Sequence, residues 1–256
     1  MKRILAFASR NRKEILRDPL SYIFCLAFPV VMLLVMTLVD ASIPAEAGMT
    51  VFRIRNLSAG IAVFGQTFIM LFAALTVSKD RSGSFLTRMY ATPMTHTDFI
   101  AGYMLPLLVI SLAQTVVIYI ASWIISLVTG TPLNVGGLLL SAAALIPSSV
   151  LFISLGLLFG TLFGEKTAPG MCSIVISLSS FLGGIWFDAE QTGGVLLKIC
   201  KCLPFYYCTR SARAAVRLDF GTDTFWMPLL VVTACAAIVA AGAAAAFRSR
   251  MKADLS

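Results

Sequence analysis

Leu57-Ser-Ala-Gly-Ile-Ala-Val-Phe-Gly-Gln-Thr-Phe-Ile-Met-Leu-Phe-Ala-Ala-Leu-Thr-Val-Ser78 is an uninterrupted stretch without a single charged side chain. A helix rises about 1.5 Å per residue, so about 20 apolar residues cross the roughly 30 Å hydrocarbon core of a bilayer. The stretch has this length and composition. It therefore predicts a transmembrane helix, and the rest of the chain can be searched for others like it.

Five further stretches of similar length are equally free of charge. The six expected spans are 20–39, 57–78, 101–128, 138–163, 167–187 and 225–247. The composition agrees, because 59% of the 256 residues are apolar, 12% are charged and the mean hydropathy is +0.90. These values are typical of a membrane protein. The sequence predicts an all-α membrane protein with six transmembrane helices in a single domain over residues 1–256, divided into 1–19, 20–187, 188–224, 225–247 and 248–256.

The first span has one competing interpretation. Ala45-Glu46-Ala47 resembles the small-residue cleavage site of a secretory signal. A signal core is about 7–15 residues long, whereas 20–39 is longer and follows an extended basic segment. The length favours a retained span.

The basic residues indicate the orientation, since cytoplasmic connections of membrane proteins carry an excess of Lys and Arg. One side of the membrane would hold Lys2, Arg3, Arg10, Arg12, Lys13, Arg17, Lys79, Arg81, Arg88, Lys166, Arg248, Arg250 and Lys252. The other side would hold Arg53, Arg55, Lys198, Lys201, Arg210, Arg213 and Arg217. The formal charge of +8 is thus better explained by topology than by nucleic-acid binding. We expect a multi-pass protein of the plasma or inner membrane with both termini cytoplasmic.

Residues 2–17 have the pattern of an amphipathic helix. Apolar side chains share one face, namely Ile4, Phe7, Ala8 and Ile15, and basic ones oppose it, namely Lys2, Arg3, Arg10, Lys13 and Arg17. Pro19 then breaks or redirects the chain. This pattern predicts a helix lying in the membrane interface, marked by Arg10, Lys13, Arg17 and Pro19. A generic positive-inside anchor without further role explains the same residues and is favoured by the pattern alone.

The connection after the second span predicts a short cytoplasmic helix. After Gly83, four large apolar residues recur at helical spacing, Phe85, Leu86, Met89 and Tyr90, and Pro93 ends the pattern. Such a helix could lie against the bilayer. Its apolar side chains could equally dock into a groove on another protein.

Residues 188–224 are too long and too apolar for a simple outer loop, so we expect this segment to fold back onto the membrane face, with Pro204, Phe205, Tyr206 and Tyr207 at its centre. The segment contains three cysteines, Cys200, Cys202 and Cys208. An oxidising compartment would allow one disulfide among them, and a reducing one would leave all three free. Cys25, Cys172 and Cys235 fall inside spans, where packing is their expected role.

Several chemistries lack their sequence signatures. No Lys follows a Gly, so the chain has no phosphate-binding loop for ATP, and His96 is the only His. We therefore expect no catalytic centre, no metal site and no cofactor. The spans as drawn hold no ionisable residue, which argues against proton-coupled transport. Gly156, Gly160 and Gly164 form successive GxxxG spacings that permit close helix packing, within this chain rather than at a dimer seam.

Four motifs in order along the chain carry a family resemblance. They are Arg17-Asp18-Pro19, the pair Phe28-Pro29, the connection Asp80-Arg-Ser-Gly-Ser-Phe-Leu-Thr-Arg-Met-Tyr-Ala-Thr-Pro93, and Leu203-Pro204. Together they resemble the permease subunits of type 2 ABC exporters, the ABC-2 family, over nearly the whole chain. In one respect the chain departs from the family, because Lys79-Asp80-Arg81 is net basic where acidic residues are usual.

The resemblance implies a role for each segment. It makes the short inner helix a coupling helix that contacts a nucleotide-binding subunit through Ser84, Phe85, Leu86, Arg88, Met89, Tyr90 and Pro93. It makes 188–224 a re-entrant hairpin near the exit. ATP and Mg would be bound by two copies of a cytoplasmic ABC ATPase, and a second permease subunit would complete a homodimer or heterodimer in the lipid bilayer.

The expected cargo follows from the composition of the spans and from the family resemblance. Uncharged spans rich in Phe, Met, Ser and Thr suit an amphiphilic, drug-like, peptide or lipid-like substrate, and the Arg17-Asp18-Pro19 form resembles drug-export and antimicrobial-resistance members. Two alternatives stay open. The chain could belong to a polysaccharide or lipid exporter, or it could be a membrane-embedded enzyme or assembly factor without transport activity.

The charge distribution yields a testable topology. Single cysteines introduced within 188–224 of a Cys-free background should react with an impermeant reagent from outside. Residue 84 should react only after the membrane is opened, because its connection is predicted to be cytoplasmic. Labelling of residue 84 from outside would overturn the orientation.

Overall fold

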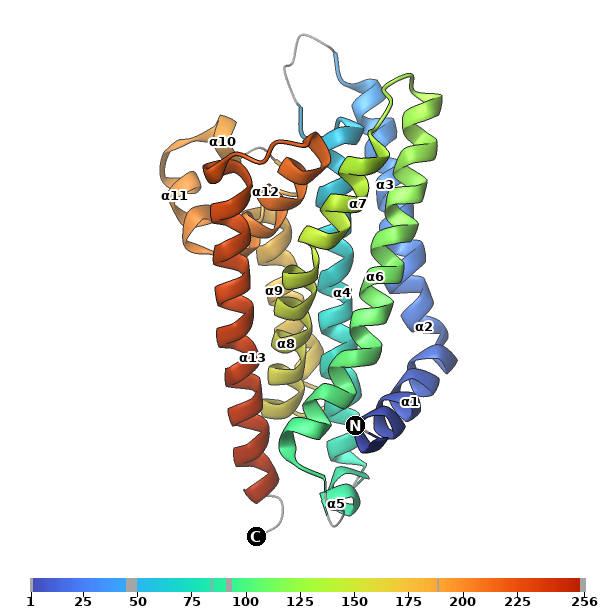
Figure 1. Ribbon diagram of the computed structural model, residues 1–256, viewed down its shortest axis with the longest axis vertical. Coiled ribbons are helices and arrows are strands. Elements are labelled where there is room, and N and C mark those ends of the chain that lie inside the picture. The colour runs from blue at the N-terminus through green and yellow to red at the C-terminus, as the bar shows by residue number, and fades with distance from the viewer. Residues whose placement is uncertain (1, 45–49, 84, 91–93, 188, 254–256) are drawn as a thin grey trace.

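The computed structural model describes residues 2–44, 50–83, 85–90, 94–187 and 189–253, and this part of the chain is a helical bundle without strands (Figure 1). The helices in order are α1 (Lys2–Arg17), α2 (Pro19–Tyr22), η1 (Ile23–Ala27), α3 (Phe28–Ser42), α4 (Ile54–Ser82), α5 (Phe85–Tyr90), α6 (His96–Val128), α7 (Val135–Ala144), α8 (Ile146–Leu162), α9 (Ala168–Leu182), α10 (Ala189–Thr192), α11 (Gly194–Cys202), α12 (Pro204–Arg217), η3 (Thr222–Trp226) and α13 (Met227–Ala253). The all-α membrane fold is confirmed.

Five helical units in the described residues are long and apolar enough to cross a membrane. They are Ile23–Ser42, Ile54–Ser82, His96–Val128, Val135–Leu162 and Thr222–Arg250. Each coincides with one of the stretches predicted from the sequence. Three of the units are composite: the π-helical turn η1 leads into α3, α7 meets α8 at Leu145, and the π-helical turn η3 leads into α13.

The predicted span 167–187 is shorter than expected. Its helix, α9, has 15 residues, or about 22 Å at 1.5 Å per residue, which is less than the roughly 30 Å of a hydrocarbon core. The chain leaves the helix at Gly183 and turns through Gly184, whose φ of +68° suits glycine. In Figure 1, α9 carries the chain from the end of the bundle near α5 toward the end with α10 and α11. A sixth complete crossing stays a prediction.

The centre of the bundle is α4. In its most apolar window 83% of residues are buried, against 17% in the first and last spans. It packs against α3, α6, α8, α9 and α12. Since α4 contacts most of the other spans, a displacement of its C-terminal end shifts the helices packed against it.

Two glycines of α8 allow its close approach to α4. A Cβ on Gly156 would lie 2.2 Å from the Met70 carbonyl oxygen, and one on Gly160 would lie 2.6 Å from that of Ala74. Gly164 has no such neighbour within 4 Å. The GxxxG spacing therefore serves packing within the chain, as its pattern indicates.

A layer of buried polar side chains also joins α4, α6 and α8. Gln66 donates to Ser149 Oγ at 2.9 Å and accepts from Ser148 Oγ at 2.6 Å, and Ser111 lies 2.7 Å from Ser149. Such hydrogen bonds stabilise helix association inside a membrane, where the hydrophobic effect does not favour protein contacts over lipid contacts.

The segment predicted to fold back does return onto the bundle. Only the packing of its helix α12 is seen here: α12 contacts α4, α7 and α13, and Phe205 stacks on Phe152 with ring centroids 5.7 Å apart. Tyr206 is buried, while the Tyr207 hydroxyl donates to the Lys201 carbonyl oxygen at 2.9 Å. Pro204 starts the helix, a position where proline is favoured. The depth of this segment in the membrane stays a prediction.

All six cysteines are free, so the disulfide considered for the outer segment is not formed. Cys200 packs with Ala189 and Tyr206, whereas Cys208 belongs to the main core of the bundle and Cys202 is exposed. Burial raises the pKa of the Cys200 thiol and raises the pKa of Cys208 to about 12. Both groups therefore hold little of the thiolate that disulfide formation needs.

The glycine contacts give a prediction for stability. Gly156→Ala should lower the free energy of unfolding by about 1–3 kcal/mol, because the new methyl group meets backbone that cannot rotate away. Thermal unfolding of the purified protein in detergent measures the effect. Gly164→Ala is the matched control and should change stability by less than about 0.5 kcal/mol. Equal effects of the two substitutions would contradict the packing described here.

Candidate functional site

Helix α1 packs against the helical bundle. Phe7, Ala8 and Ile15 are buried, and the buried Asn11 side chain donates to the Gly102 carbonyl oxygen of α6 at 3.1 Å. A Cβ on Gly102 would lie 2.4 Å from the Phe7 ring, so α6 is smooth where α1 crosses it. The apolar face predicted from the sequence exists, and it covers α6.

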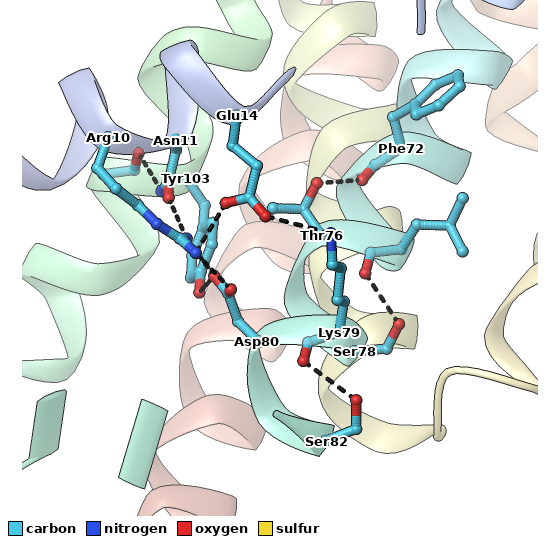
Figure 2. A network of polar contacts seen from close by, with 12 residues as sticks. Arg10, Asn11, Glu14, Phe72, Thr76, Ser78, Lys79, Asp80, Ser82 and Tyr103 are labelled. Atoms are coloured by element: carbon cyan, nitrogen blue, oxygen red, sulfur yellow. Dashed lines mark hydrogen bonds and ion pairs between the residues drawn. The ribbon is translucent and has the colours of Figure 1, made fainter. Parts of the chain in front are cut away.

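An ion pair joins α1 to the central helix. Arg10 donates from Nη1 to Asp80 Oδ2 at 2.6 Å and from Nη2 to Asp80 Oδ1 at 2.8 Å, as Figure 2 shows. The Tyr103 hydroxyl of α6 donates to the same Oδ2 at 2.7 Å. Asp80 is 4% exposed, and two parallel guanidinium bonds plus a phenol give its carboxylate three donors. One side chain of α4 thus fixes both α1 and α6.

Two sequence expectations are wrong at this point. Arg10 was expected on the outward basic face of the N-terminal helix, but it turns inward to Asp80. Asp80 was expected in a connection, but α4 continues to Ser82 and buries it. The helical pattern places residues on a face, whereas the partner that draws Arg10 inward lies 70 residues away in the chain.

The neighbours of Asp80 bind other parts of the same chain. Lys79 Nζ lies 3.4 Å from Glu14 Oε1 of α1, and Glu14 also pairs with Arg10 at 2.7 Å (Figure 2). Arg81 donates to the carbonyl oxygens of Gly160, at 3.3 Å, and Thr161 at the end of α8. Cations at a helix C-terminus complement its dipole. The net basic triplet 79–81 is therefore engaged with α1, α6 and α8.

Helix α5 leans on this cluster. The Arg10 guanidinium carbon lies 4.1 Å from the centre of the Phe85 ring, and Phe85 stacks on Phe7 with centroids 6.4 Å apart. Leu86 is only 1% exposed. We call the set of Arg10, Glu14, Asp80, Phe85 and Tyr103 the junction. Arg10 is its centre, because it contacts a carboxylate on either side and an aromatic ring.

Three of the four apolar side chains considered for docking, namely Phe85, Leu86 and Met89, pack against the chain itself. Leu86 lies in the core, and Phe85 and Met89 pack against it from its edge. Arg88 is exposed. Tyr90 ends the helix, and Ser84 and Pro93 lie outside the described residues. Helical spacing identified the apolar face correctly but could not tell whether it covers a partner or the chain itself.

Charge keeps Arg10 protonated. Burial acts to lower the pKa of Arg10, but the hydrogen bond and charge of Asp80, with the charge of Glu14, raise that pKa above its ordinary value. An arginine with a raised pKa keeps its proton over the whole physiological range. Arg10 is thus a permanent cation within the junction.

The other residues that the sequence predicted for the interfacial helix line a cavity. Lys13, Arg17 and Pro19 line a space of about 920 Å³ between α1 and α4, together with Glu14 and Lys79. Lys13 and Arg17 are exposed. Within the described ranges no three His, Cys, Asp or Glu side chains gather as metal ligands would.

The described residues form a bundle of helices long and apolar enough to cross a membrane, with a short helix held at one end. The family model of the ABC-2 type transporter matches residues 2–217, from α1 to the end of α12. The chain belongs to the ABC-2 type transporter family, whose members are transport components and not enzymes. A comparison with curated proteins gives no match.

The junction predicts an order of stability losses. Arg10→Gln should cost most, because it leaves the almost fully buried Asp80 carboxylate without its cation. Asp80→Asn should cost about 1–3 kcal/mol, since Arg10 is partly exposed and keeps Glu14. Lys79→Gln should cost less than about 0.5 kcal/mol, because its pair with Glu14 is exposed. Thermal unfolding in detergent compares the three.

The double mutant of Arg10→Gln and Asp80→Asn provides the control. It should be more stable than the sum of the two single losses implies, with a coupling of about 1–2 kcal/mol. Strict additivity would mean that the two groups do not interact.

Proposed function

We propose that this chain is the permease subunit of an ATP-driven exporter and receives its work through α5 from a separate cytoplasmic ABC ATPase. The observation that carries the proposal is the anchoring of α5 to α1, α4 and α6 through the junction. A helix that contacts only lipid would move independently of the spans when the ATPase displaces it. Helix α5 is stacked on Phe7 and Arg10, so its displacement is transmitted to the spans.

The path of the movement follows from the contacts. Phe85 and Leu86 tie α5 to Arg10 and the core, and Arg10 is tied to Asp80 near the end of α4. Because α4 packs against α3, α6, α8, α9 and α12, it distributes a displacement over the bundle. We infer that two ATPase copies close on binding ATP and move two permease subunits, identical or similar, which open a path between them.

The contact with the ATPase needs a surface that the bundle leaves free. Arg88 is exposed on α5, whereas Leu86 is buried. We infer that Arg88 faces the ATPase. For Ser84, Tyr90 and Pro93 the contact is only what the family resemblance implies. Aspartate substitutions at Phe85 and Met89 would damage the packing of the permease itself, so they cannot separate docking from folding.

The orientation is part of the proposal. Helix α1, helix α5 and the end of α13 lie at one end of the bundle, with α10 and α11 toward the other (Figure 1). The Lys and Arg bias supports a cytoplasmic location for the first end, in the plasma or inner membrane. The apolar spans favour an amphiphilic, drug-like, peptide or lipid-like cargo, as in multidrug export. A polysaccharide or lipid exporter is the alternative within the family.

Co-purification tests the proposal. The permease extracted gently from its native membrane should retain an ABC ATPase and stimulate its ATP turnover. Arg88→Glu should reduce that retention by about tenfold, because it reverses an exposed charge at the contact. Arg250→Glu makes the same charge change at the same end, on α13, and should leave retention unchanged.

Two outcomes would contradict the proposal. Loss of the ATPase in both variants alike would remove α5 as the contact. A permease that never carries an ATPase would instead favour a membrane-embedded enzyme or an assembly factor.

A further inference from the structure

A large cavity lies at the end of the bundle opposite the junction. It has a volume of about 1600 Å³ and is formed by the ends of α3 and α6, the start of α4 and the end of α12. Pockets for small molecules usually measure about 300–1,000 Å³, so this space exceeds the needs of a small polar ligand.

The lining of the cavity is divided by polarity. Leu34 and Leu38 of α3 and Ile124 and Val128 of α6 form an apolar wall, and between 48% and 83% of each side chain is exposed. Arg53, Arg55 and Arg217 lie at the polar end together with Asp40. Among the lining residues that the structure describes, three arginines face one aspartate, an excess of two positive charges (3 − 1 = 2).

The arginines differ in their partners. Arg217 is positioned, since its Nε donates to Asn56 Oδ1 at 3.1 Å. The side chains of Arg53 and Arg55 are exposed, and neither makes a hydrogen bond or ion pair with any residue that the structure describes. A guanidinium has five donors in a fixed fork that matches a phosphate or carboxylate. Two such groups are therefore available beside a third that is held in place.

The start of α4 also favours an anionic ligand. Arg53 is the N-cap residue of the 29-residue helix and gives no side-chain cap, and the first two helical residues, Ile54 and Arg55, line the cavity. Uncapped amides at a helix N-terminus carry a partial positive charge and favour anions.

We propose that this cavity binds an anionic amphiphile, with its phosphate or carboxylate head on Arg53, Arg55 and the start of α4. Its alkyl chain lies between Leu38 and Val128. The apolar wall continues down both helices through the exposed side chains of Val31 on α3 and Ile120 on α6, which gives the chain a path into the hydrocarbon region. Binding of the amphiphile stands without the proposed function, and only its role as cargo rests on it.

A binding measurement tests the head group. The probes are fluorescent lysophosphatidylglycerol and fluorescent lysophosphatidylcholine with the same tail, titrated with the purified full chain in neutral detergent. The protein should bind the anionic probe about tenfold more tightly than the zwitterionic one. The double substitution Arg53→Gln and Arg55→Gln should abolish that preference. Lys198→Gln with Lys201→Gln removes two exposed charges from α11 and should leave the preference intact.

A second comparison tests the tail. Leu38→Ser with Val128→Ser should weaken the binding of both probes by about threefold and keep the ratio of their affinities, because the apolar wall does not contact the head group. Glycerol phosphate, which has the head without the tail, should not compete at the concentrations where the lipid does. Equal competition by glycerol phosphate, or an unchanged preference in the arginine variant, would overturn the proposal.

A transport measurement distinguishes an exported cargo from a resident bilayer lipid. In vesicles containing the permease and its ATPase, the fluorescent lysophosphatidylglycerol should cross the bilayer faster with ATP if it is cargo, and the arginine variant should lose that acceleration. A bound lipid that ATP does not move is a resident bilayer lipid in the same site. Failure of ATP-driven transport with intact binding therefore counts against the amphiphile as cargo, whereas failure of binding counts against this inference, and the co-purification of the ATPase tests the proposed function separately.

Discussion

The bundle depends on one buried carboxylate. Asp80 is almost fully enclosed at the end of an apolar helix, and a charge in such a place is tolerated only when it is paired and hydrogen bonded. Arg10 supplies the charge and Tyr103 the third hydrogen bond. To reach Asp80, α1 must lie across α6, and this places Phe7 and Arg10 where Phe85 can stack on them. The position of α5 follows from the ion pair.

The same central helix is held at both ends. At one end Asp80 and Arg81 fix it to α1, α6 and α8. At the other end Arg213 and Arg217 of α12 donate to the backbone and side-chain oxygens of Asn56. Between them, close glycine contacts with α8 and the polar layer around Gln66 leave α4 little freedom to bend. Helix α4 thus links the region of α5 to the cavity at the far end, so the two proposed sites share one mechanical element.

The sequence predicted what local pattern determines. Charge-free length located the spans, because crossing a bilayer requires it, and the spacing of Gly156 and Gly160 predicted a smooth helix face. The pairing of Arg10 with Asp80 was not predictable, since no periodicity relates residues 70 positions apart. One signal was present. Alternating charges in Lys79-Asp80-Arg81 directly after an apolar span are costly unless each has a partner, and their partners proved to be Glu14, Arg10 and the end of α8.

The same distinction explains the other differences. The apolar spacing of α5 was correct, but its face covers the protein's own core, and only tertiary contacts decide that. Helix α9 ends early because its C-terminal glycines turn the chain, although hydropathy continues beyond them. The cysteines at 200 and 208 are close in sequence and fall into separate apolar clusters, because α11 and α12 lie on either side of Leu203.

The central claim is that the Arg10 and Asp80 pair makes α1 and α5 one rigid unit. Spin labels at the exposed positions 12 and 88, in a background without native cysteines, measure this directly by dipolar spectroscopy in nanodiscs. The account predicts a narrow distance distribution in the wild-type sequence and a clearly broader one with Asp80→Asn, because only the substitution releases the two helices. Equally broad distributions with and without Asp80, or equally narrow ones, would contradict it.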